Sequence, residues 1–197
     1  MTGEETIRNF DKVGADIISD LGIIMLQIAQ SANAKIKDRI INSGRNADGQ
    51  MYAPYSTTPM LTGRSALTQV AYEAKAGTKK KRKELTWVTI KNKGKNAKLF
   101  ELAGGYKEFR EIQGRQTGFV DFAFSGRMWD SVQVISNASQ HQKGSAVIST
   151  LSIEQMKKLE GHTERKGVLL DLSDEEVDDL QKQVEKWVAD IIKRNGL

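Results

Sequence analysis

Apolar residues recur at steps of three and four along the first part of the chain, which is the spacing of one face of an α-helix. The stripe consists of Ile7, Phe10, Val13, Ile17, Leu21, Ile24, Ile28, Ala32, Ile36 and Ile40. This spacing predicts a helix over residues 4–43, and Gly44 supplies the left-handed residue that commonly ends one. Two interpretations stay open: a single arm that packs on neighbouring subunits, or two helices broken near Gly22.

Alternating apolar positions in the middle of the chain indicate strands instead. The strands expected from this alternation lie at residues 84–91, 120–124, 132–136, 146–150 and 168–170. Those at 132–136 and 146–150 are expected to pair as an antiparallel hairpin. Short helical segments are expected at residues 97–102, 106–112 and 152–159, and a further short helical stretch after Ser125-Gly126 is expected to contain Met128 and Trp129. The second of them is expected to place Tyr106 and Phe109 against the sheet rather than in a binding patch.

A second long helix is predicted near the C-terminus. Ser173 and Glu176 have the spacing of a capping box, and Asp174 and Glu175 add acidic residues to the first turn, where they favour the helix dipole. Its buried stripe is expected to contain Val177, Leu180, Val184, Trp187, Val188, Ile191 and Ile192.

These elements together predict an α+β fold, with a long N-terminal helix, a central antiparallel sheet of about four strands and a C-terminal amphipathic helix. Residues 1–44 are expected to form a helical arm. Residues 45–197 are expected to form the α+β domain, with a basic hairpin insertion at about residues 57–118.

The charge of the chain is unevenly spread. The net charge is +5, but residues 75–115 carry 13 basic and 4 acidic residues, whereas residues 171–190 carry 8 acidic and 2 basic ones. Such asymmetry indicates contact with something charged, which includes another copy of the same chain. The absence of cysteine excludes disulfides, thiolate nucleophiles and cysteine-built metal sites, and it fits a reducing cytoplasm.

The sequence predicts no membrane partner. Residues 1–5 are acidic, unlike the start of a signal peptide. The longest uncharged apolar stretch, residues 21–34, has 14 residues and is interrupted by polar ones. A membrane helix needs about 20 predominantly apolar residues.

The inventory of catalytic side chains is small. His141 and His162 belong to no recognisable metal or catalytic motif, so we expect them to be solvated loop histidines. The acidic residues at 171–179 are interpreted as helix capping and a solvated face rather than as a cation site. The sequence has no phosphate-binding glycine motif. We therefore expect no catalytic, cofactor-binding or metal-ligating residue, and a metal-dependent enzyme is a third hypothesis without a supporting pattern.

A basic segment flanks the strand expected at residues 84–91. Its candidate contacts to a partner or to DNA are Lys79, Lys80, Lys81, Arg82, Lys83, Lys93 and Lys95. The alternative is a mobile, solvated hairpin loop. Aromatic residues are sparse here, so we expect contact with phosphate groups rather than recognition of bases, with a steep dependence on salt.

Three short motifs follow one another in an order found in a known family. The first is Asp48-Gly49-Gln50-Met51-Tyr52-Ala53-Pro54-Tyr55-Ser56, after the long helix. The second is Ser125-Gly126-Arg127-Met128-Trp129-Asp130-Ser131, and the third is Arg165-Lys166-Gly167-Val168-Leu169-Leu170-Asp171-Leu172-Ser173. In this order the chain resembles the bacteriophage virion-morphogenesis or tail-completion proteins, a head–tail connector group with minor tail protein Z-like members. It departs from that family in lacking a proline after Arg165 and in a long insertion between the first two motifs.

The resemblance implies a non-enzymatic structural protein of the virion neck, which completes the tail or joins the head to the tail. It also implies a homo-oligomeric ring of about six or twelve copies, portal, adaptor or tail-tube partners, transient contact with packaged DNA, and assembly in the host cytoplasm. The motif residues with an implied structural role are Asp48, Gly49, Tyr52, Pro54, Ser125, Gly126, Met128, Ser131, Leu170 and Ser173. The alternative function is a nucleic-acid-binding accessory protein that uses the basic segment at residues 79–98.

Overall fold

The computed structural model describes residues 3–63, 86–92, 95–123, 125–136 and 144–196. Within these residues it shows a long N-terminal helix, five strands in two antiparallel sheets and a C-terminal helix, which confirms the expected α+β class. The chain divides into two compact units. The first unit contains Met1–Met51 and Ser125–Leu197, and the second unit contains Tyr52–Phe124.

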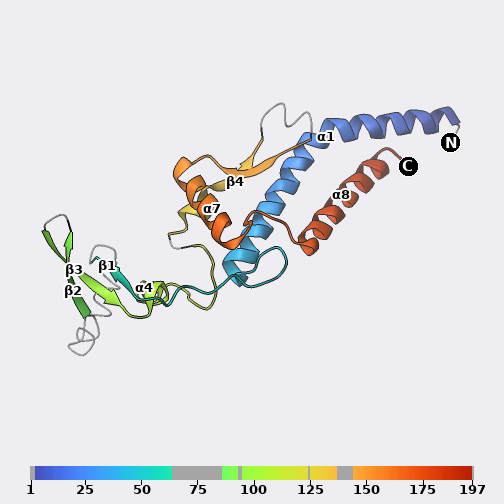
Figure 1. Ribbon diagram of the computed structural model, residues 1–197. Coiled ribbons are helices and arrows are strands. Elements are labelled where there is room, and N and C mark those ends of the chain that lie inside the picture. Colours follow the sequence, from blue (N-terminus) through green and yellow to red (C-terminus); the bar gives the residue numbers. More distant parts are fainter. Residues whose placement is uncertain (1–2, 64–85, 93–94, 124, 137–143, 197) are drawn as a thin grey trace. The chain divides into compact units, whose positions relative to one another are not determined.

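The first unit is built on one long helix (Figure 1). Helix α1 covers Gly3–Asp38 and continues without a break into a π-helical turn, η1, at Arg39–Ser43. This confirms a single helix that continues through Gly22, and Figure 1 shows that α1 changes direction along its length. Gly44 ends it with a φ of +63°, and its N–H donates to the carbonyl of Ile40 at 3.0 Å, which is the left-handed stop that the sequence indicates.

Helix α8 (Asp174–Arg194) packs along α1 and runs antiparallel to it. At one end, Lys35 and Asp179 form an ion pair at 2.8 Å. At the other end, the side-chain amide of Asn195 donates to the carboxylate of Asp16 at 2.9 Å. The buried apolar residues of the long helical segment and of α8 are Val13, Ala32, Ile36, Ile40, Leu180 and Ile191.

A two-stranded sheet packs on α1. Strands β4 (Val132–Ile135) and β5 (Val147–Thr150) pair antiparallel, which confirms the expected hairpin. The ammonium group of Lys37 donates to the carbonyl of Val132 at 2.7 Å. This hydrogen bond fixes the start of β4 beside the C-terminal turns of α1.

Two helices contact each other and this hairpin. Helix α5 (Arg127–Ser131) precedes β4 and buries Met128 and Trp129. Helix α7 (Ile153–Lys166) follows β5 and begins at the predicted cap, Ser152. It extends past residue 159, where the sequence predicted its end, because the glycine at position 161 is accommodated inside the helix.

The described part of the second unit contains a three-stranded antiparallel sheet and a helix. The strands lie in the order β1 (Met60–Thr62), β3 (Lys95–Leu102) and β2 (Thr86–Asn92). Helix α4 (Gly105–Ile112) packs on β3. The core and the apolar residues packed against it are Phe100, Leu102, Phe109, Met60, Tyr106 and Ile112. This confirms the expected packing of the aromatic helix against the sheet.

Strand β3 corrects one expectation. Residues 97–102 were expected to form a short helix, but they pair with β2, with Val88 opposite Leu99. The alanine, lysine and leucine of this segment favour helix locally. The ladder to β2 and the burial of alternate residues Phe100 and Leu102 outweigh that preference. Strand β1 lies in a stretch without clear patterning and was not predicted.

Two other expected strands are wrong for the described residues. Residues 120–123 are irregular, and Phe122 has a φ of +51°, which an extended strand does not allow. Residues 168–170 form no strand either. Leu169 is fully buried there, whereas Val168 is exposed. The apolar run at residues 168–170 therefore reflects one buried side chain in an irregular segment and not a paired strand.

A buried ion pair holds the irregular loop in the second unit. Arg110 Nη2 donates to both carboxylate oxygens of Asp121 at 3.0 Å, and both side chains are almost fully buried. The Tyr55 hydroxyl donates to the same carboxylate at 2.7 Å, and the guanidinium lies 4.4 Å from the centroid of the Tyr55 ring. Burial, together with the hydrogen bond to Asp121, raises the pKa of Tyr55 far above its usual value. The two buried charges are therefore paired and hydrogen-bonded, as burial requires.

We expect Asp121→Ala to destabilise the second unit by about 3–5 kcal/mol, because it leaves the guanidinium of Arg110 buried without its counter-charge. The amide signals of this unit in two-dimensional NMR, followed through a urea titration, measure the change. Lys158→Ala, which breaks an exposed ion pair within α7, is the control and should leave stability almost unchanged. Equal effects of the two substitutions would contradict the role of the buried pair.

Candidate interaction surface

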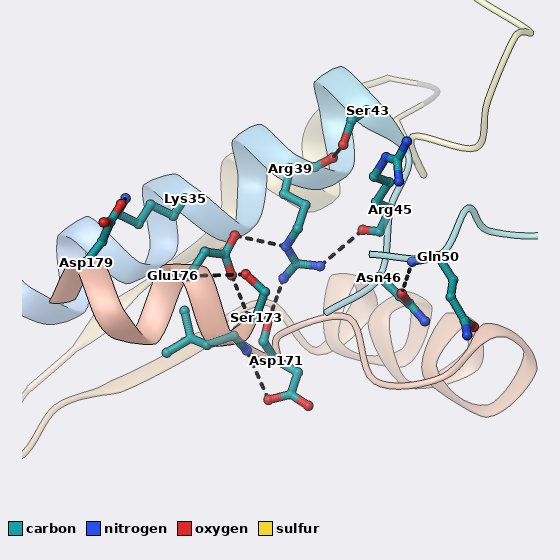
Figure 2. Close-up of polar contacts among 11 residues, drawn as sticks. Lys35, Arg39, Ser43, Arg45, Asn46, Gln50, Asp171, Ser173, Glu176 and Asp179 are labelled. Carbon is teal, nitrogen blue, oxygen red and sulfur yellow. Dashed lines mark hydrogen bonds and ion pairs between the residues drawn. The ribbon is translucent and has the colours of Figure 1, made fainter. Parts of the chain in front are cut away.

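Arg39 joins three segments of the first unit (Figure 2). Its Nε donates to the carboxylate of Glu176 at 2.9 Å, its Nη1 to the carbonyl of Arg45 at 3.1 Å, and its Nη2 to the carbonyl of Asp171 at 2.5 Å. The side chains of Arg39 and Glu176 are only 12% and 11% exposed. One guanidinium thus holds together the end of the first helix, the loop after it and the segment that leads into α8.

The same carboxylate caps α8. Ser173 Oγ accepts from the N–H of Glu176, and Glu176 Oε2 accepts from the N–H of Ser173 at 2.9 Å. This confirms the predicted capping box. Glu176 uses one oxygen for the cap and the other for Arg39.

Two neighbouring acids of the run at 171–179 also have protein partners. The side chain of Asp171 accepts from the N–H of Leu172 at 3.0 Å. The hydrogen bond from Lys35 lowers the pKa of Asp179, and the same bond raises the pKa of Lys35. The acidic run was interpreted as helix capping and a solvated face; the structure confirms the cap and shows in addition that Asp179 pairs with Lys35.

The first sequence motif begins with a tight turn in the first unit. The side chain of Asn46 accepts from the N–H of Gln50 at 2.8 Å, and the N–H of Gly49 donates to the carbonyl of Asn46 at 3.1 Å. Gly49 has a φ of +77°, which favours glycine at this position. Asp48 is exposed beside it. In this motif the Asp-Gly pair therefore shapes a turn.

Other motif residues differ in their surroundings. Tyr52 is buried in the second unit, with its ring edge-on to Phe122 at 4.8 Å between centroids. Pro54 and Ser125 are exposed, whereas Leu170 is half-buried. The motif residues are divided between the two units: Tyr52 and Pro54 belong to the second unit, and the others belong to the first.

The second motif forms α5 and its attachment to β5. Gly126 precedes the helix with a φ of +79°, and a Cβ there would lie 3.3 Å from the carboxylate of Asp130. The hydroxyl of Ser131 bonds to the carbonyl of the buried Met128 at 2.7 Å and lies 3.0 Å from the hydroxyl of Thr150. This motif therefore positions the strand pair beside α1.

Most of the basic segment lies outside the described residues. The residues concerned are Lys79, Lys80, Lys81, Arg82, Lys83 and Lys93, and His141 lies outside them as well. Lys95 begins strand β3, and Lys98 is exposed in the same strand. Contact of this segment with DNA or a partner stays a prediction.

His162 lies in α7 and is half-buried, so the expectation of a solvated loop histidine is wrong for this residue. Burial lowers its pKa, and the positive charge of Arg165 lowers it further. Among the described residues, no group of three or more side chains of the metal-ligating types lies together.

Exposed apolar side chains gather at two places in the first unit. The first is the start of α1, where Ile7, Phe10 and Ile18 are 65%, 61% and 76% exposed. The second is the start of α7, where Leu151 and Ile153 are 72% and 74% exposed. The helical stripe in the sequence contains Ile7 and Phe10 but cannot show which turns α8 leaves uncovered. The second group was not predicted from the sequence. The signal that could have indicated it is the pair of apolar residues, Leu151 and Ile153, on either side of the cap Ser152.

By length and composition alone, the helical segment Glu4–Ser43 is able to cross a membrane. An 18-residue window in it has a mean hydropathy of 1.3, and 6% of that window is buried inside the structure. The core helices of other proteins and signal sequences pass the same test. Most of this apolar window is therefore not enclosed by the protein itself.

Comparison with known proteins identifies no relative. No protein-family model, curated protein or solved structure matches this chain. We therefore infer its function from the fold, from the exposed apolar groups and from the order of the sequence motifs.

We expect Glu176→Ala to lower the free energy of unfolding by roughly 3 kcal/mol, because it opens the cap and leaves the mostly buried Arg39 without its carboxylate. Ser173→Ala removes only the cap and should cost about 1 kcal/mol. Urea denaturation followed by circular dichroism measures both. If the two variants lose the same stability, the contact with Arg39 contributes nothing.

We expect the stability of the first unit to fall as the pH drops below 6.5, the ordinary pKa of histidine. Because burial depresses the pKa of His162, the unfolded chain binds a proton in a pH range where the folded chain does not, and acid therefore favours unfolding. An NMR titration of the imidazole signal in a His141→Gln background should give a midpoint below 6.5. A midpoint at or above that value would refute the prediction.

Proposed function

We propose that this chain is a non-enzymatic structural protein of a bacteriophage virion, located at the neck, where it completes the tail or joins the head to the tail. Copies of the chain form a ring of about six or twelve subunits. The ring contacts portal, adaptor or tail-tube proteins and touches packaged DNA transiently. Assembly takes place in the host cytoplasm.

The observation that carries this proposal is the uncovered apolar start of α1. Val13 is the first buried residue of the helix, so the ten residues before it extend about 15 Å beyond the part that packs in the unit. An exposed apolar helix face of this kind is typical of a surface that contacts another protein. The order of the three sequence motifs supports the virion neck as the place of that contact.

The alternative is a nucleic-acid-binding accessory protein that uses the basic segment at residues 79–98. The salt dependence of DNA affinity separates the two functions. A slope equal to several phosphate contacts favours the alternative, whereas negligible DNA binding at low salt removes it.

Quantitative mass spectrometry of purified virions tests the neck assignment. We expect the chain to be present at a small symmetric number, about six or twelve copies per particle. Its absence from virions, while it is abundant in the infected cell, would contradict the proposal.

A further inference from the structure

We propose that the start of α1 in one copy of the chain docks on the start of α7 in the next copy. The arm surface consists of Ile7, Phe10, Ile18, Glu4 and Asp11. The receiving surface consists of Leu151, Ile153, Met156, Arg127 and Lys157. This inference rests on the assembly of copies in the proposed function, and it names the two surfaces that meet.

Ile7 and Phe10 of the arm surface lie beyond the end of α8. Helix α8 ends beside Asp16, where the side chain of Asn195 binds it, and Figure 1 shows α1 continuing past that end. Ile7, Phe10 and Ile18 follow helical spacing and so lie on one side of α1. Gly14 is on the same side, and a Cβ built there meets nothing within 4 Å. The face is therefore both apolar and open to close approach.

The receiving surface surrounds the N-terminus of α7. Leu151 and Ile153 lie on either side of the cap Ser152, and Met156 is exposed one turn later. Three exposed apolar side chains thus lie within six successive residues of the chain. They offer an apolar centre for a partner helix.

Basic residues border this apolar centre. Lys157 follows Ile153 by one helical turn, so it lies on the same face. Arg127 begins α5, which packs on α7, and its charge adds to the hydrogen bond from Lys158 in lowering the pKa of Glu154. Because Lys158 already pairs with Glu154 at 2.6 Å, the positive charge at this border comes from Arg127 and Lys157.

The two surfaces complement each other in charge. Residues 4–12 carry three acidic and two basic side chains, and Glu4 and Asp11 lie about one turn before and after Ile7. The receiving surface has the opposite sign. An apolar centre with a rim of complementary charge is the usual composition of a protein–protein interface.

The arm cannot reach the receiving surface of its own copy. Lys37 binds the first residue of β4, and Thr150 pairs with that same residue, so the start of α7 lies near the C-terminal end of α1. Phe10 and Lys37 are 27 residues apart on α1, which is roughly 40 Å measured along the helix axis. The contact is therefore between copies. Because it joins two different surfaces, it is head-to-tail, which is the geometry that closes into a ring.

Disulfide trapping tests the contact directly, because the chain contains no cysteine. We expect a mixture of Ile7→Cys and Ile153→Cys chains to give a cross-linked dimer under mild oxidation, and neither chain alone to do so. A chain with both substitutions should give a ladder of multimers. Ile23→Cys, at an exposed position elsewhere on α1, replaces Ile7→Cys as the control and should give no product.

Charge reversal tests the complementarity. Glu4→Lys with Asp11→Lys should weaken association by roughly tenfold, since like charges then face each other. Arg127→Glu with Lys157→Glu on the other chain should restore it. Glu185→Lys, an exposed reversal on α8, is the control and should have no effect.

Three results would overturn the inference. They are the absence of the mixed dimer in cells that make both chains, cross-linking of Ile7→Cys to itself, and binding to phosphatidylglycerol vesicles that Phe10→Ser abolishes while the mixed dimer does not form. None of these results bears on whether the chain is found in virions. Conversely, if the mixed dimer forms but the chain is absent from virions, the contact between copies is supported and the neck location is contradicted.

Discussion

The antiparallel pairing of α1 and α8 determines the rest of the first unit. The contact of Arg39 with Glu176 fixes the register at one end, and the contact of Asn195 with Asp16 fixes it at the other. Helix α8 has 21 residues and α1 has 36, so α8 cannot cover the whole apolar stripe. Because the C-terminal turns of α1 are covered by α8 and by the β4–β5 hairpin, the uncovered part is the N-terminal one. The exposed arm is a direct consequence of this register.

Both units depend on a guanidinium that is almost removed from water. In the first unit, Arg39 binds a carboxylate and two carbonyls, and in the second unit Arg110 binds Asp121 from a helix that packs on the sheet. Each arginine donates hydrogen bonds to backbone or carboxylate oxygens of an irregular loop. Those oxygens are outside the hydrogen-bond ladders of helices and sheets. The irregular backbone around Phe122 is stable for this reason. These arginines therefore have structural roles.

The sequence predicted the elements whose signals are local. The stripe of α1, the capping box at Ser173 and the hairpin of β4 and β5 depend on spacing within a few turns, and the structure confirms them. Strand β3 was misassigned because pairing with β2, rather than propensity, decides its conformation. The alternation around residue 122 was misleading because it treated Asp121 as a polar position of a strand. Asp121 is instead buried in an ion pair with Arg110 of α4, eleven residues earlier in the chain. The exposed group at the start of α7 could not be predicted, because solvent exposure depends on which elements pack nearby.

We propose that the start of α1 acquires its apolar partner from outside its own copy. Hydrogen–deuterium exchange, measured on the dilute chain and on assembled neck particles, tests it most directly. We predict that the amides of residues 4–12 exchange rapidly in the dilute chain and slowly in the particles, while those around Ile36, which is buried in its own unit, are protected in both. Equal exchange of residues 4–12 in the two states would contradict the claim.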